Sequence, residues 1–384
     1  MTKIHLNKNV YDATLDRIRY LFDEFDTVSV GISGGKDSTV VFNLAMQVAK
    51  EKKKLPLHVL FIDQEAEWNF TIDEVRKIMY RKDVKPYWYQ MPIHIENATS
   101  NIVNSLYCWE EGKDKDWIRP KEKISIKENT YGVEWWKGIF DAIFIKDFPK
   151  GTHCNLSGVR TEESPGRFIG LTSQHTYKGI TWGTKSASKT NHFAFYPLYD
   201  WSYTDIWKAI YDNKWSYNKL YDYQYRYGTP IQNMRVSNLH HETAVRALFY
   251  LQEIDGDLYN KLVERLPGVD TAGKMGFDDF WVKKLPFMFN TWAEYRDHLI
   301  KHLVHKEDWK KDINKFVTFH DKLFKGDEKW DTKAAKQVCQ CIITNDYALT
   351  KLRNFAIITQ RYKRDLRDYE VIKNRKKSKK TSNN

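Results

Sequence analysis

The sequence predicts an α/β protein built on a doubly wound parallel sheet, with an appended, mainly α-helical C-terminal domain. Apolar, β-branched runs at 27–32, 57–63 and 87–93 have the composition of buried parallel strands. Segments with helical periodicity separate these runs. Strands that alternate with helices form βαβ units, and such units build parallel sheets.

Each element has its own local signal. Apolar residues recur at helical spacing over 11–25, which predicts an amphipathic helix, and again over 41–48, after the first strand. A capping-box pattern, Thr71-Ile72-Asp73-Glu74, predicts a helix over 71–81. The sheet resumes at 153–159, and Ser202 is a suitable N-cap for a helix that reaches Ile210.

A glycine-rich turn, Ser33-Gly34-Gly35-Lys36-Asp37-Ser38, joins the first strand to its helix. Glycines let backbone N–H groups converge on an anion, and the helix N-terminus adds positive potential there. The turn is not a Walker A loop, because only three residues separate Gly31 from the Gly-Lys pair. It also lacks the G-x-G-x-x-G spacing of dinucleotide sites. We therefore expect a phosphate-binding loop of another class, the alternative being an ordinary strand-to-helix turn.

Carboxylates follow the second strand. Asp63 ends this strand, at the edge where doubly wound sheets bind their ligands. Its carboxylate is expected to hold Mg²⁺ or to accept hydrogen bonds from ribose or adenine, or else to cap the next turn. Glu65 and Glu67 either share this role or are solvated.

A second anion site is predicted after the strand at 153–159. The following loop carries Arg160, Ser164 and Arg167. Guanidinium groups bind phosphate and sulfate oxygens in a bidentate manner. Opposite a phosphate loop, these arginines would bind a second anion of the nucleotide or substrate; a surface loop with salt bridges is the alternative.

Three motifs, in order, resemble those of one family. The loop at 33–38 resembles the SGGxDS motif of the PP-loop proteins, the adenine nucleotide α-hydrolase superfamily. The stretch 158–167 resembles the second motif of the phosphoadenosine phosphosulfate (PAPS) reductase family. The segment 197–207 matches its Pro-x-x-x-Trp-x-x-x-Asp-Ile-Trp pattern. The resemblance covers 27–228, a little over half of the chain, and implies a HUP-like PP-loop fold.

The resemblance implies ATP or PAPS as the ligand, with Mg²⁺ if ATP is cleaved between its α and β phosphates. The residues implied to bind nucleotide are Ser33, Gly34, Gly35, Lys36, Asp37, Ser38, Asp63, Arg160, Arg167 and Arg235. The implied catalytic residues are Lys36, Asp37 and Arg160, and the implied Mg²⁺ ligands are Asp37 and Asp63. Catalysis would then orient an oxygen nucleophile and stabilise the departing pyrophosphate.

The cysteines depart from the family pattern. True reductases carry a redox-active cysteine near the C-terminus, and their iron–sulfur members carry paired cysteines; Cys108, Cys154, Cys339 and Cys341 include no C-x-x-C pair. Apolar neighbours of Cys339 and Cys341 predict buried structural thiols. We therefore expect no iron–sulfur cluster and no thiol-dependent reduction. ATP pyrophosphatase, adenylyl-transfer or sulfonucleotide chemistry is the expected enzyme activity. The alternative is a nucleotide-gated regulatory or DNA-binding protein without turnover.

The predicted domains are a nucleotide-binding domain at 1–228, a helical domain at 229–370 and a basic, disordered tail at 371–384. A tryptophan-rich insertion at 101–138 interrupts the first domain, and its tryptophans are expected to form core or a lid. In the helical domain, helices are predicted at 292–303 and 309–324.

Beyond Gly228, Arg235, His240 and His241 are candidates to complete the pocket. The layout of this region resembles that of the immunoglobulin-binding regulator group, prophage-associated proteins that are paired with a ParB-like partner.

Charge is concentrated at the end of the chain. The formal net charge is +12, and residues 351–384 carry 12 Lys and Arg against 3 Asp and Glu. This segment either binds DNA or RNA phosphates or simply solubilises the chain. The whole sequence is 41% hydrophobic and 15% aromatic, a composition that predicts a folded protein. A polar N-terminus and the lack of an 18-residue apolar run predict a cytoplasmic protein without a membrane segment.

Overall fold

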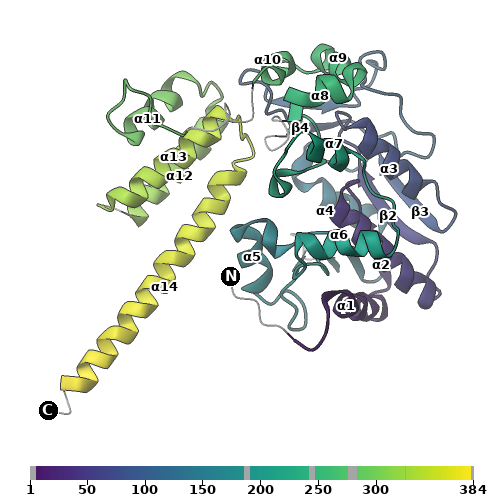
Figure 1. The fold of residues 1–384 in the computed structure, drawn as a ribbon, viewed down its shortest axis with the longest axis horizontal. Helices are drawn as coiled ribbons and strands as arrows, with labels where there is room; N and C mark the ends of the chain where they lie inside the picture. Colours follow the sequence, from purple (N-terminus) through teal and green to yellow (C-terminus); the bar gives the residue numbers. More distant parts are fainter. Residues whose placement is uncertain (1–5, 186–190, 242–246, 276–282, 325, 382–384) are drawn as a thin grey trace. The chain divides into compact units, whose positions relative to one another are not determined.

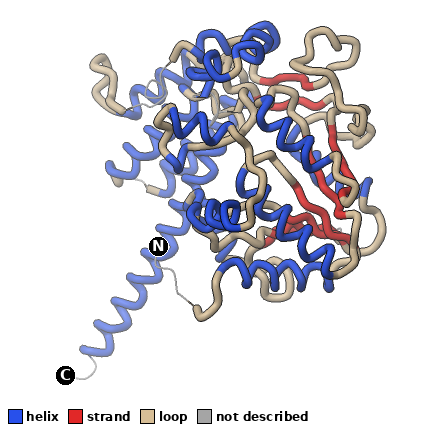
Figure 2. Tube along the Cα trace, turned by 45° about the vertical axis from the view of Figure 1, so that its right-hand side comes forward, coloured by secondary structure: helices blue, strands red, loops and turns tan. Residues whose placement is uncertain are grey.

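The computed structural model describes residues 6–185, 191–241, 247–275, 283–324 and 326–381. The chain divides into two compact units. The first comprises Met1–Thr99 and Ser105–Met275, and the second comprises Ser100–Asn104 and Gly276–Asn384. The β-sheets lie in the first unit, whereas the described part of the second is helical (Figure 2).

A six-stranded sheet forms the centre of the first unit (Figure 1). Its strands, in spatial order, are β3 (Val84–Tyr89), β2 (Leu57–Ile62), β1 (Thr27–Gly31), β6 (His153–Leu156), β8 (His192–Phe195) and β7 (Gly183–Lys185). β7 is antiparallel to β8, and all other neighbouring strands are parallel. From β1 the chain proceeds outward to β2 and β3, and then returns to β6 on the other side of β1. The predicted doubly wound sheet is confirmed.

The two faces of the sheet differ in polarity. Val30 and Leu156 face an apolar core formed with α1 (Val10–Glu24), α2 (Lys36–Glu51), α3 (Asn69–Met79) and α6 (Tyr203–Asp212). Successive strand residues point to opposite faces, so Ser29 and Asn155 lie on the other side. There His153 stacks on Phe148, which directly follows α4 (Trp136–Asp147). Helices therefore cover both faces, as a doubly wound sheet requires.

Most local predictions are confirmed. α1 (Val10–Glu24) matches the predicted helix 11–25 to within one residue at each end. α6 begins with a capping box formed by Ser202 and Asp205. The capping box predicted at Thr71 and Glu74 is wrong, because α3 already begins at Asn69. Both side chains are buried and make tertiary contacts instead: Thr71 Oγ1 accepts from Asn218 Nδ2 at 3.0 Å.

The third predicted strand, 87–93, is also corrected. β3 ends at Tyr89, and Ile93 begins β4 (Ile93–Glu96), which pairs antiparallel with β5 (Ser105–Cys108) in a separate sheet. Pro92 has no N–H with which to continue the ladder of β3. Pro86 is tolerated within β3 because this strand lies at the sheet edge.

Residues 229–275 belong to the first compact unit. They contribute α8 (Leu248–Ile254), α9 (Gly256–Arg265) and α10 (Val269–Gly273), which follow α7 (Leu220–Arg226). Arg265 Nε donates to Glu65 Oε1 at 2.7 Å, and Leu239 N donates to Ala66 O at 2.8 Å. The first compact unit thus continues past Gly228, where the sequence analysis places the end of the nucleotide-binding domain. The domain limits at 228 and 370 stay predictions.

Four helices make up the described part of the second unit: α11 (Trp292–His302), α12 (Glu307–Leu323), α13 (Glu328–Ile343) and α14 (Thr350–Thr381). α11 and α12 match the predicted helices, and Trp309, Ile313, Val338 and Leu352 form part of the core. α14 includes residues 371–381, for which the composition predicts a disordered tail. Within the described residues, no helix is long and apolar enough to cross a membrane.

Candidate functional site

The predicted phosphate loop lies where the strand order of the sheet reverses, between β1 and β6. α2 begins at Lys36, so its first N–H groups face this carboxyl edge of the sheet. Gly34 has a φ of +68°, and a Cβ there would lie 2.7 Å from Thr71 Cγ2. Gly158, after β6, packs so closely on α2 that a Cβ would lie 2.6 Å from the carbonyl carbon of Asp37. Gly34 therefore permits the backbone conformation of the loop, and Gly158 permits the close approach of the segment after β6 to the start of α2.

Hydroxyl groups hold the loop in place. Ser38 Oγ donates to Gly35 O at 2.9 Å and accepts from Ser33 N at 3.2 Å. Tyr221, from α7, is buried, and its hydroxyl accepts from Lys36 N at 3.2 Å. Lys36 Nζ also lies 5.3 Å from the centroid of the tyrosine ring. Tyr221 therefore sits at the first amide of α2, against the loop.

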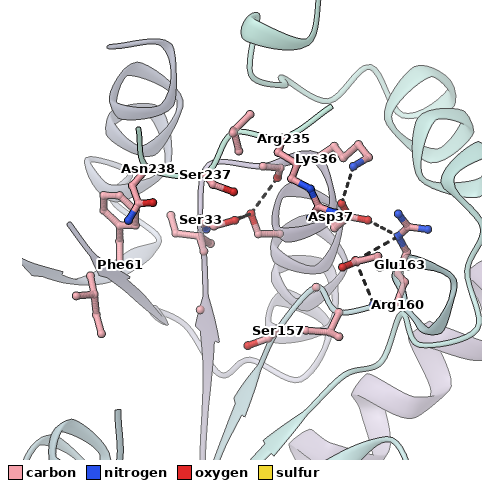
Figure 3. A pocket seen from close by; sticks show the side chains of 18 of the residues that line it. Ser33, Lys36, Asp37, Phe61, Ser157, Arg160, Glu163, Arg235, Ser237 and Asn238 are labelled. Carbon is pink, nitrogen blue, oxygen red and sulfur yellow. Dashed lines mark hydrogen bonds and ion pairs between the residues drawn. The ribbon is translucent and has the colours of Figure 1, made fainter. Parts of the chain in front are cut away.

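Asp37 bridges two cations (Figure 3). Its Oδ2 lies 3.0 Å from Lys36 Nζ, and its Oδ1 lies 2.5 Å from Arg160 Nε. Arg160 is buried, and its Nη1 lies 2.9 Å from Glu162 Oε2. The structure thus brings together the three predicted catalytic residues, although they come from two loops far apart in sequence.

Two further arginines lie beside this cluster. Arg167 lies in α5 (Pro165–Thr172), where Ser164 Oγ accepts from Arg167 N at 3.1 Å, and its guanidinium pairs with Glu163. Desolvation, and then the nearby guanidinium of Arg235, lower the pKa of Arg167. The arginines predicted to bind anions therefore face the same cavity as the phosphate loop.

The cavity has a volume of about 620 Å³. Its wall combines the loop, the arginines, an apolar end and one helix: Ser33, Gly35, Lys36, Asp37 and Ser38; Arg160, Arg167 and Arg235; Leu60, Phe61 and Ile62; and Trp136, Phe140 and Phe144 of α4. Of the residues predicted to bind nucleotide, Gly34 and Asp63 are not part of the lining. The cavity therefore joins cationic groups to apolar surface, as a nucleotide requires.

Asp63 is fully buried at the end of β2. Its Oδ1 accepts from Arg119 Nη2 and from Glu65 N, the latter at 3.0 Å. Its Oδ2 accepts from Trp88 Nε1 at 3.0 Å and from Gln90 Nε2 at 2.9 Å. Four donors surround the carboxylate, which supports a structural role rather than contact with a ligand.

The predicted Mg²⁺ ligands are both engaged by other groups of the chain. Asp37 is paired with two cations, whereas the oxygens of Asp63 are engaged by four donors. Among the residues that the structure describes, no group of three or more His, Cys, Asp or Glu side chains could hold a metal ion. This donor set does not fit a resident magnesium ion, so we assign no chemical step to one.

Glu65 and Glu67 are buried, not solvated. Glu65 has a φ of +63°, and its carboxylate accepts from Trp109 N at 2.6 Å and from Arg265 Nε at 2.7 Å. Glu67 lines the cavity. Desolvation, and then Asp63, raise the pKa of Glu67 to about 8. At neutral pH this side chain is therefore mostly a neutral carboxylic acid.

The tryptophan-rich insertion is in part core, as expected. Trp109 is fully buried, its Nε1 donates to Asp63 O at 2.7 Å, and its ring meets Trp117 edge to face. Trp136 lines the cavity. By contrast, His240 does not line it: this side chain is buried and its Nδ1 lies 2.8 Å from Glu96 O.

Several polar lining residues were not found by the sequence analysis: Gln64, Ser157, Tyr203, Tyr221, Ser237 and Asn238. Gln64 lies two residues after the end of β2 and Ser157 directly follows β6, so the rule that ligands bind at strand ends could have found them. Asn238 comes from a segment without a recognisable motif, and only the fold brings it to the cavity.

All four cysteines are buried, as predicted for Cys339 and Cys341. Desolvation raises the pKa of Cys108 and of Cys154, and it raises the pKa of Cys339 to about 12. None of the four lines the described cavity. These thiols are therefore poorly suited to act as nucleophiles there.

The fold and the loop together define a doubly wound α/β protein with a glycine-rich strand-to-helix loop at the point where the strand order reverses. The chain belongs to the phosphoadenosine phosphosulfate reductase domain family, whose sequence profile matches residues 27–227. This match confirms the family resemblance of the three motifs.

Full-length similarity extends to a protein whose function is not defined. The uncharacterized protein YbdN of Escherichia coli (strain K12) is 26% identical over 406 residues, covering 97% of this chain and 98% of that protein. The uncharacterized protein MJ0973 of Methanocaldococcus jannaschii is 27% identical over 267 residues, covering 67% of this chain and 52% of that protein.

Distant similarity to solved structures was also found. PAPS reductase from Candida auris is 16% identical, with a TM-score of 0.33 over 62% of this chain and 98% of that chain. FMN adenylyltransferase from Candida glabrata is 14% identical, with a TM-score of 0.35 over 57% of this chain and 62% of that chain.

Proposed function

We propose that the chain binds an adenine nucleotide, ATP or PAPS, and cleaves or transfers it at a phosphate without a thiol of its own. One observation carries the proposal: the amide-rich loop at 33–38 and the guanidinium of Arg160 face one cavity. Membership in the PAPS reductase domain family supports the nucleotide. The burial of all four cysteines supports chemistry that does not use a thiol.

The residues of the chain would act by position and charge. With ATP, an oxygen nucleophile attacks the α phosphorus, the bond from this phosphorus to the bridging oxygen breaks, and pyrophosphate leaves. Loop N–H groups, the hydroxyls of Ser33 and Ser38, and Lys36 would hold the departing pyrophosphate. Asp37 fixes the directions of Lys36 and Arg160 before the nucleotide arrives.

Conversion of ATP labelled at the α phosphorus into a labelled adenylyl product, with release of unlabelled pyrophosphate, tests this proposal. Arg160→Met removes the buried guanidinium and is expected to lower turnover by roughly 10²- to 10³-fold, the usual cost of losing one preorganised donor. Lys208→Met, in an exposed ion pair with Asp212 on α6, is the matched control for losing a surface cation. Saturable ATP and PAPS binding by the wild type with no turnover of either would contradict the enzymatic proposal.

A second candidate function is suggested by the charge of α14. Its described side chains include six cations, against the single acid Asp365: Lys351, Arg353, Arg361, Lys363, Arg364 and Arg367. We propose as the alternative a cytoplasmic, nucleotide-gated regulator of the prophage-associated type. It would bind DNA or RNA phosphates through this basic end and act with a ParB-like partner. Removing residues 371–384 should then reduce the salt dependence of DNA binding, and an unchanged slope would count against it.

A further inference from the structure

We propose that Asn238 selects the base of the nucleotide, its Oδ1 accepting a hydrogen bond from the exocyclic amino group of a 6-aminopurine. The inference rests on the proposed nucleotide function and names a specificity residue for the same cavity. Asn238 lies outside residues 27–227, to which the family profile extends. The family match by itself therefore assigns it no role.

The position of Asn238 in the cavity suits contact with the base of a nucleotide. Its side chain is buried and lines the cavity. Both Asn238 and Phe61 line the cavity, and Figure 3 shows them on the opposite side of Ser33 from Arg160. Phosphates held between the loop and Arg160 would therefore leave the base directed toward Phe61 and Asn238. An apolar ring surface with a few fixed polar groups is the usual environment of a bound base.

In the side-chain amide of Asn238, the nitrogen forms a hydrogen bond and the oxygen does not, among the described residues. Its Nδ2 donates to Gln64 Oε1, which orients the group. Its Oδ1 is buried and has no hydrogen-bond partner among the described residues. A buried acceptor without a donor is unfavourable, and native proteins rarely leave one. A ligand that supplies an N–H at this point removes that penalty.

The backbone that directly follows Asn238 is held by two other segments of the chain. Leu239 N donates to Ala66 O at 2.8 Å, in the loop that follows β2. His240 O accepts from Ala98 N at 2.8 Å, just after β4. The acceptor is therefore held in place before a ligand binds, and preorganisation of this kind increases selectivity.

Base chemistry decides which nucleotide fits. Adenine presents an amino donor at C6, whereas hypoxanthine and guanine present a carbonyl oxygen there. That oxygen would oppose Oδ1 with two acceptors face to face. Glu67 lines the same cavity and is mostly protonated at neutral pH, so it can donate to an unprotonated ring nitrogen. The Asn238 acceptor is therefore the group that favours adenine.

The direct test compares ATP with ITP and with purine riboside triphosphate, which share its sugar and phosphates. We expect the wild-type full chain to bind both analogues roughly ten- to a hundredfold more weakly than ATP by calorimetry, the usual effect of one lost buried hydrogen bond. Equal affinity for ATP and purine riboside triphosphate would overturn the base assignment and leave the proposed function intact. Tighter binding of ITP would overturn it too, because the amide would then present its donor. Failure of both ATP and PAPS to bind would remove the proposed function and this inference together.

A variant pair assigns the effect to the residue. Asn238→Ala should bring the affinities for ATP and purine riboside triphosphate to within about threefold, because neither then meets the acceptor. Asn101→Ala, at an exposed asparagine, is the matched control and should keep the wild-type preference. If folded Asn238→Ala retained the preference, Asn238 would not be the selecting group. The wild-type comparison decides the proposal even if this variant does not fold.

Discussion

At the residue scale, single positions in the loops after β1 and β6 determine how closely the two predicted anion-binding segments approach. Gly158 is the clearest case, because the atoms that its missing side chain would meet are all backbone atoms of Asp37 and Ser38. Backbone at the start of α2 cannot move aside as a flexible side chain can. Any side chain at 158 must therefore push Arg160 away from Asp37.

Gly158→Ala is expected to lower the free energy of unfolding by about 1–3 kcal/mol, the cost of overpacking a close contact. It should also weaken ATP binding. Gly170→Ala is the matched control: this glycine lies in α5 with no atom within 4 Å of an added Cβ. Alanine there should stabilise the helix by up to about 1 kcal/mol. Urea denaturation and calorimetry measure both variants, and equal stability of the two would contradict the argument.

At the element scale, the face of the sheet beneath α4 contains a buried histidine layer. His153 Nε2 lies 2.8 Å from Ser29 Oγ, and its Nδ1 lies 3.3 Å from His192 Nδ1. Desolvation, then His192 and His58, lower the pKa of His153 to about 3. Desolvation also lowers the pKa of His58 to about 4. The folded state therefore holds these rings neutral, whereas the unfolded chain protonates them near pH 6.5.

The sign of the pH dependence follows. Because the folded pKa of His153 lies below its unfolded value, its contribution is complete above pH 6.5 and is lost as pH falls toward 3. The expected loss is about 1.4 kcal/mol per pH unit for one ring. His153→Gln should reduce this slope between pH 6.5 and 4, although it also lowers stability at pH 7.5. Urea midpoints for the wild type, His153→Gln and the exposed-site variant His175→Gln measure the effect; an unchanged slope would contradict it.

Sequence patterns predicted elements with strong periodicity and predicted the loop, because these depend on neighbours along the chain. α1, β1, α2 and α6 are of this kind. The patterns failed where distant contacts decide the outcome. Thr71 is a residue type that often caps helices, but its hydroxyl accepts a hydrogen bond from Asn218. Asp63 lies where a ligand-binding carboxylate is expected, but it forms an ion pair with Arg119. Both partners are distant in the sequence, so no local pattern predicts either contact.

At the scale of the whole molecule, the sheet-containing unit depends on chain beyond the matched family region. Arg265 of α9 forms an ion pair with the fully buried Glu65, and residues 238–240 hydrogen-bond to the loops after β2 and β4. Composition gave no reason to extend the first domain past 228, since the helical pattern that follows resembles that of an independent domain. Contacts between distant segments, such as the buried ion pair of Arg265 with Glu65, join these residues to the first unit, and sequence periodicity does not predict such contacts.

Truncation tests this dependence. A chain ending at Met275 should unfold cooperatively and bind ATP, whereas one ending at Gly228 leaves the Glu65 carboxylate buried without Arg265. Removing one partner of a buried ion pair costs about 3–5 kcal/mol. The shorter chain should therefore melt at lower temperature or aggregate. Thermal melts and size-exclusion chromatography compare the two, and equal stability would favour the limit at 228.

The ion pairs of Asp37 also affect which solutes can occupy the loop. Lys36 and Arg160 are each engaged by an internal anion, so any entering solute must compete with that carboxylate. Chloride or a single phosphate offers little charge with which to displace it, whereas a polyphosphate offers several negative charges along one chain. Under the proposed function, the Asp37 carboxylate would therefore disfavour small anions at the loop and favour a polyphosphate, whose several charges can replace it at both cations.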